Sequence, residues 1–163
     1  MIEIIPDFRC CFDALRYPSL CSDALMVHWW PSPVHHAKQV FDAESRGVGC
    51  NPGRVLRGPE LTAMRFKQSL QQAYEAMLAA NHVHASYRDL QAWTFCPESL
   101  CLLLFELRLL GLSSLRATMV KPTYGNQFCA VLEKAETTGA TLRPEQLQAF
   151  ETERLALTRL LRF

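Results

Sequence analysis

Charged side chains follow directly after an apolar stretch at the start of the chain. The β-branched run at 2–5 is ended by Pro6, and Asp7, Arg9 and Asp13 stand just beyond it. Such a run predicts a buried strand that feeds a loop. In a parallel α/β sheet, ligands bind outside the carboxyl ends of the strands, so these three residues are candidate substrate contacts. The alternative is an Asp–Arg pair that only supports the loop, which is the commoner role for such a pair.

The stretch NHVHASYRD holds a second group of residues that could do chemistry: His82, His84, Tyr87 and Asp89. Histidine titrates near neutral pH, so one of them could act as a general base. A polar connector between two helices is the alternative. We favour the connector, because no nucleophile or cofactor site is secured beside these residues.

Metal-ligating residue types are crowded into the first third of the chain, at Cys10, Cys11, Cys21, His28, His35, His36 and Cys50. Structural zinc sites usually show C-x-x-C or H-x₃₋₅-H spacing, and neither occurs among them. Packed thiols and surface imidazoles are therefore the favoured interpretation, and we expect no metal site.

The stretch VFDAESRGVGCNPG superficially resembles a strand, an acidic residue and a glycine-rich cofactor turn. We interpret it as a surface loop instead. The apolar run before it is only Val40-Phe41, Pro52 removes a main-chain donor, and RVLRGP follows where a helix would be needed. The adjacent tryptophans Trp29 and Trp30 could mark an exposed binding patch or pack inside an insertion.

Composition bounds the class of protein. The chain has 163 residues, 49% hydrophobic and 20% charged, with a net charge of +1. This predicts one globular domain and gives no electrostatic reason to expect nucleic acid or a membrane as partner. Seven cysteines without a visible signal peptide favour reduced thiols and a cytoplasmic location.

The patterning predicts the elements that must position these residues. We expect one or two short helices in the aromatic, proline-broken stretch at 9–41, a loop at 45–59, and one helix from Pro59 to about Asn81. CPESLCLLLFELRLLG predicts a buried helix that begins at Pro97 and ends at Gly111.

The last third predicts a hairpin and a helix. SLRATMVK and QFCAVLEK are two strand-like runs joined by PTYGN, which is typical of an antiparallel hairpin. After a linker at 135–143, the tail from Pro144 to Phe163 predicts an amphipathic helix, with a stripe at Leu147, Phe150, Leu157 and Leu161.

Three stretches together resemble a known family. IIPDFRCCFDALRYPS, YRDLQAWTFCPESLCLLLFELRLLGL and LRATMVKPTYGNQFCAVLEK are similar, in this order, to the segments around strands five to seven of class I S-adenosylmethionine-dependent methyltransferases. QVFD at 39–42 also has a counterpart in the insertion of that group. The similarity covers most of residues 1–134.

The resemblance implies a fold and a domain organisation. The fold is α/β, a partial doubly wound, Rossmann-like sheet with a helical insertion at about 14–58 and a C-terminal helix. Residues 1–137 form the methyltransferase-like C-terminal half, and residues 138–163 form the linker and terminal helix. We expect any substrate binding at Asp7, Arg9, Asp13, Tyr87 and Asp89.

Some positions depart from the family pattern. Phe8 stands where Lys is usual, Cys10 where Tyr is usual, and Gln91 where His is usual. Cys96 replaces the Thr that would cap the buried helix, which should cost about 1 kcal/mol. Polar residues of the family pattern are lost from the loops, whereas the apolar core pattern is retained. This favours a protein that keeps the fold of the family but not the chemistry of its site.

The expected function is a truncated methyltransferase-like protein that binds no S-adenosylmethionine alone and is non-catalytic alone. Binding the cofactor needs a glycine-rich turn after the first strand and an acidic residue after the second, and both are missing from a chain that begins at the fifth strand. Two alternatives stay open. One is an active methyltransferase, with S-adenosylmethionine, completed by a partner chain that supplies the missing half-sheet. The other is a small protein-interaction module, and a homodimer would also cover the open strand.

Overall fold

The computed structural model describes residues 1–49, 52–55, 59–82, 85–135 and 143–161. Within these ranges the chain is a mixed α/β protein with a three-stranded antiparallel sheet. The elements are, in chain order, β1 (Ile2–Pro6), the 3₁₀-helix η1 (Phe8–Cys10), α1 (Cys21–Trp29), α2 (Ala37–Arg46), α3 (Pro59–Thr62), α4 (Leu70–Ala80), α5 (Pro97–Leu109), β2 (Leu115–Val120), β3 (Gln127–Lys134) and α6 (Pro144–Leu160).

The sheet has the order β1-β3-β2, so the last strand lies in the middle. β3 pairs antiparallel with both neighbours, with Ile4 opposite Cys129 on one side and Val120 opposite Ala130 on the other. The predicted hairpin of β2 and β3 is confirmed. Gly125 takes a φ of +62° inside its turn, a conformation that glycine adopts without strain.

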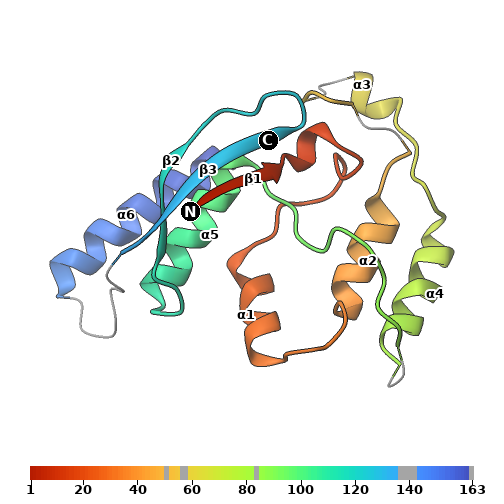
Figure 1. Ribbon diagram of the computed structural model, residues 1–163, viewed down its shortest axis with the longest axis horizontal. Helices are drawn as coiled ribbons and strands as arrows, with labels where there is room; N and C mark the ends of the chain where they lie inside the picture. The colour runs from red at the N-terminus through yellow and green to blue at the C-terminus, as the bar shows by residue number, and fades with distance from the viewer. Residues whose placement is uncertain (50–51, 56–58, 83–84, 136–142, 162–163) are drawn as a thin grey trace.

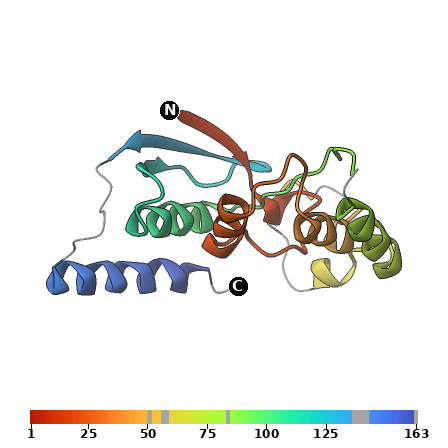
Figure 2. The same cartoon turned by 90° about the horizontal axis from the view of Figure 1, so that it is seen from below.

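One face of the sheet carries the core. Phe128, Ala130 and Leu132 of β3 pack with Leu100 and Leu104 of α5. α6 lies against the opposite side of α5, where the rings of Phe105 and Phe150 are 6.1 Å apart. Figure 2 shows the resulting layers of sheet, α5 and α6. α5 is apolar on most sides because it is enclosed between two layers, which confirms the predicted buried helix.

The other face of the sheet is uncovered by any described element. Ile2 and Ile4 are 70% and 68% exposed, whereas Ile5 packs against the core. The prediction of a buried first strand is therefore wrong for Ile2 and Ile4. The reason is the alternation of side chains along a strand, which directs Ile5 toward α5 and Ile2 and Ile4 to the opposite side. Figure 2 shows this open side of β1 and β3.

A helical group lies beside the sheet and α5. α1 and α2 come from the aromatic, proline-broken stretch, as predicted, and α4 packs against α2 (Figure 1). α2 continues to Arg46, so the predicted loop at 45–59 begins two residues later, at Gly47. The predicted linker at 135–143 lies almost wholly outside the described residues.

The single helix predicted from Pro59 to Asn81 is wrong. The structure has two helices here, α3 and α4, because the residues between them bond elsewhere. Lys67 N donates to Gly47 O over 2.9 Å, and Gly49 N donates to Arg65 O over 3.2 Å. These bonds use main-chain groups that a continuous helix would need, so α4 begins afresh after Ser69.

Candidate functional site

The loop that follows β1, residues 7–19, is the candidate site, and we call it the strand-end loop. Asp7 is fully buried at its start and accepts from Arg9 Nε over 2.9 Å and from Arg9 Nη2 over 2.7 Å. The Thr123 hydroxyl also donates to Asp7. Asp7 therefore fixes Arg9 by a bidentate ion pair, the strongest geometry that such a pair can adopt.

Arg9 lies between Asp7 and the first turn of α5. Its Nη1 atom is 3.4 Å from Oε2 of Glu98. The Asp7 carboxylate, through its hydrogen bond, raises the pKa of Arg9 above its ordinary value. A pocket of about 360 Å³ opens beside it, with walls that include Cys101 of α5 and Leu157 of α6. Because Asp7 and Glu98 already neutralise this guanidinium, it offers little attraction to an anionic ligand.

A second buried ion pair joins Asp13 and Arg16, with Arg16 Nη1 2.9 Å from Asp13 Oδ1. Both side chains are almost completely buried. Arg16 also donates to the main-chain oxygens of Gln91 over 2.6 Å and of Ala92 over 3.2 Å. Burial raises the pKa of Asp13 above its ordinary value of 3.8, and Arg16 opposes this shift only in part.

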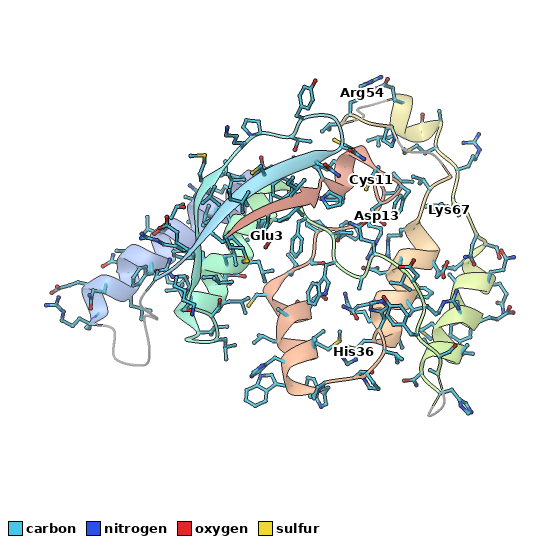
Figure 3. All side chains as sticks on the ribbon, in the orientation of Figure 1. Glu3, Cys11, Asp13, His36, Arg54 and Lys67 are labelled. Atoms are coloured by element: carbon cyan, nitrogen blue, oxygen red, sulfur yellow. The ribbon has the colours of Figure 1, made fainter. Side chains whose placement is uncertain are left out.

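Two thiols complete the strand-end loop. Burial raises the pKa of Cys10 and that of Cys11 to about 11. Cys11 Sγ donates to Phe8 O over 3.6 Å and lies 3.8 Å from Asp13 Oδ2 (Figure 3 labels Cys11 and Asp13). A thiol with this pKa is protonated near neutral pH, so neither cysteine is an activated nucleophile.

Hydrogen bonds join the strand-end loop to residues 91–95. Thr94 donates through its hydroxyl to Tyr17 O over 2.7 Å and through its N–H to the Ser19 hydroxyl over 3.0 Å. Phe8 N donates to Phe95 O over 3.0 Å. The structure thus brings together the first two of the three stretches on which the family resemblance depends.

The remaining predicted site residues are spread over the surface. Asp13 and the exposed Asp89 both line a cleft of about 500 Å³, together with Glu44 and Lys67. Tyr87 is 65% exposed and faces His35, with ring centres 5.2 Å apart. Asp89 and Tyr87 therefore do not join the Asp7–Arg9 pair in one site. His82 is exposed, and His84 lies outside the described residues.

The glycine stretch after α2 begins with residues 47–49, whose main-chain donors are already in use. Gly47 N donates to Ala43 O, Val48 N to Phe12 O and Gly49 N to Arg65 O, over 3.0, 2.8 and 3.2 Å. The stretch also follows the C-terminus of α2, the negative end of that helix dipole. Nucleotide phosphates are bound by free N–H groups at a helix N-terminus, so this geometry is unsuited to a cofactor turn.

The structure also bears on the tryptophan pair and on the metal-ligating residue types of the first third of the chain. Trp29 and Trp30 are 65% and 68% exposed, which favours the surface-patch alternative over packing within the insertion. Among the described residues, no three His, Cys, Asp or Glu side chains lie where they could hold a metal ion. Cys50, one of the predicted candidates, lies outside those residues.

The partners that decide this site were not predicted from the sequence. They are Arg16, Ser19, Thr94, Glu98 and Thr123. The Asp13–Arg16 spacing of three was a usable signal, since it suits one turn of chain. Thr94 and Thr123 gave no such signal, because they are distant in sequence from the groups that they contact.

Comparison with protein-family models, with curated proteins and with solved structures finds no match to this chain. In the part of the chain that the structure describes, no helix has the length and apolar character required to cross a membrane.

Proposed function

We propose that this domain is a methyltransferase-like scaffold that binds no S-adenosylmethionine and is non-catalytic by itself. One observation carries the proposal. The polar groups of the strand-end loop, where a doubly wound fold would contact substrate, are bonded to the protein itself. The occupied main-chain donors of residues 47–49 also support it.

The kinship with strands five to seven is supported by three features. First, β1 leads into the strand-end loop, which bonds to residues 91–95. Second, the buried helix α5 lies in the chain between residues 91–95 and the hairpin. Third, β3 of the hairpin pairs with β1 and so completes the sheet. These features agree with the order and the contacts that a C-terminal half-sheet needs. Fold kinship alone does not supply an activity.

Isothermal titration of the full chain with S-adenosylmethionine tests the proposal. We expect no binding heat at millimolar cofactor, with circular dichroism before and after the titration to show that the chain is folded. A dissociation constant in the micromolar range would contradict the proposal.

The second candidate function is an active methyltransferase that a partner chain completes. The exposed apolar side of β1, with Ile2 and Ile4, favours it, because an apolar strand surface normally packs against something. This candidate requires a partner chain that supplies the missing strands and a Gly-x-Gly turn. Methyl transfer by the mixed chains, but by neither alone, would support it.

A further inference from the structure

The register of β1 and β3 fixes which main-chain groups of β1 are used. Met1 and Leu132 exchange two hydrogen bonds, each 2.8 Å long, and Asp7 N donates to Asn126 O over 2.9 Å. In an antiparallel pair, hydrogen-bonded and non-bonded residues alternate. Glu3 and Ile5 therefore direct their main-chain groups toward β3.

The same alternation directs the N–H and C=O groups of Ile2 and Ile4 away from β3. Pro6, which is next in this series, has no N–H to donate, and proline is tolerated where a strand faces outward. Beyond Pro6 this edge is taken up by Phe95, which forms a parallel bridge with Asp7 and accepts from Phe8 N. The open edge of β1 thus consists of four main-chain groups on two residues.

The side chains along this edge are two apolar residues and one acidic residue. Ile2 and Ile4 are exposed on the uncovered face of the sheet, which Met119 and Val131 extend. Glu3 lies on the other face, half-buried, and has no ion pair among the described residues (labelled in Figure 3). The edge therefore presents an acidic residue between two apolar residues.

A second copy of the chain fits this edge poorly. The two-fold antiparallel arrangement that uses all four groups pairs Ile2 with Ile4 of the other copy, and so places Glu3 directly opposite Glu3. Like charges opposite each other destabilise a sheet. Shifting the axis to Ile4 would place the other strand beside Pro6, which has no N–H to donate and stands next to the bridge between Asp7 and Phe95.

We propose that the open edge of β1 docks an extended strand of another protein that carries a basic residue between two apolar residues. The basic residue would lie opposite Glu3, and the apolar residues would lie beside Ile2 and Ile4 on the uncovered face. Four main-chain hydrogen bonds would provide the pairing, as in other cases of strand addition. This inference adds a kind of partner to the proposed function and does not depend on whether the cofactor binds.

The test uses the peptide acetyl-Thr-Val-Lys-Val-Thr-amide, whose pattern is the same in either strand direction. The control peptide has Glu in place of Lys. Amide NMR signals and hydrogen exchange of the full chain report binding. We expect the Ile2 and Ile4 amides to exchange fast in the free protein and slowly with the Lys peptide. The Glu3 and Ile5 amides should be protected in both states.

The Lys peptide should bind roughly five to ten times more tightly than the Glu peptide, because an attractive cross-strand pair replaces a repulsive one. Glu3→Lys should reverse this preference. Ile4→Pro should abolish binding but keep the fold, since the N–H that it removes faces away from β3. Tyr124→Ala, at an exposed position in the hairpin turn, is the matched control and should bind like the wild type.

Three outcomes would overturn the proposal. The first is unchanged Ile2 and Ile4 amides at millimolar Lys peptide, and the second is equal binding of both peptides. The third is a concentration-dependent dimer in sedimentation that Glu3→Gln strengthens, because a second copy would then occupy the edge. None of these depends on the S-adenosylmethionine titration, so the two proposals fail separately.

Discussion

Each carboxylate of the strand-end loop has a guanidinium partner within three residues. Asp7 pairs with Arg9, and Asp13 pairs with Arg16. Removing charges from water is costly, and only good geometry and further hydrogen bonds offset that cost. Arg9 and Arg16 both supply such bonds, so these four residues support the loop and the chain beside it.

The buried carboxyl of Asp13 makes stability depend on pH. Because its pKa is raised in the folded state, the folded protein holds the proton more tightly than the unfolded chain. This contribution to stability is complete below the ordinary value of 3.8 and is lost as pH rises through the raised pKa. Asp13→Asn cannot titrate, so the unfolding free energy of the wild type relative to this variant should fall as pH rises through the raised pKa.

Urea unfolding of both proteins across this pH range checks the prediction, with the free energy extrapolated to water. The wild type should lose stability relative to Asp13→Asn as pH rises. A difference that is the same at every pH would contradict the assigned direction of the Asp13 pKa.

At the scale of the elements, the start of α4 shows how a cap divides a helical pattern. The Ser69 hydroxyl accepts from Gln72 N over 3.2 Å, and Gln72 Oε1 accepts from Ser69 N over 2.9 Å. This reciprocal capping box satisfies two donors that a helix start leaves free. It makes Leu70 a better first residue of a helix than any position nearer to Thr62.

Ser69→Ala should lower the free energy of unfolding by about 1 kcal/mol, because it removes the cap of α4. Thermal or urea unfolding measures the loss. The exposed Ser86, which lies in no helix, offers a matched control. Ser86→Ala should change the same quantity by less than about 0.5 kcal/mol, and an equal loss in both variants would contradict the role of the cap.

For the whole molecule, the layers leave the sheet covered on one side only. The helices α5 and α6 lie on the same side, and the helical group with α2 and α4 lies laterally (Figures 1 and 2). Antiparallel sheets commonly have one solvated face, but that face is usually polar. Here it holds Ile2 and Ile4, which is why we assign a docking role to this side of β1.

Substitutions on the two faces of β1 should differ in their effect. The double variant Ile2→Thr with Ile4→Thr should keep the unfolding free energy within about 0.5 kcal/mol of the wild type, because both side chains are exposed and Thr suits a strand. Ile5→Thr should lower it by about 2 kcal/mol, because Ile5 contacts the core and a hydroxyl would be placed there. Urea unfolding of the three proteins checks both values, and an equal effect on both faces would contradict the assigned orientation of β1.

Much of the fold follows from local patterns. The β2–β3 hairpin, α5 and α6 are confirmed near their predicted bounds, because their apolar periodicity and their proline and glycine boundaries lie within short stretches of chain. The break between α3 and α4 escaped prediction because its cause is the pairing of residues 65–67 with residues 47–49. Apolar spacing alone does not show that main-chain groups bond to another segment.

The sequence by itself determined most of the segments that form strands and helices, though not the break between α3 and α4, and it placed Asp7, Arg9 and Asp13 directly after a strand. Tertiary structure decided what these residues do, because Asp7 is bonded by Thr123 and Arg9 lies beside Glu98, both distant in sequence. Arg16, the partner of Asp13, likewise donates to Gln91 and Ala92. It also decided which face of β1 is buried. The physical reason is that side-chain types and their period are local properties, whereas hydrogen-bond saturation and burial depend on chain segments that only the fold brings together.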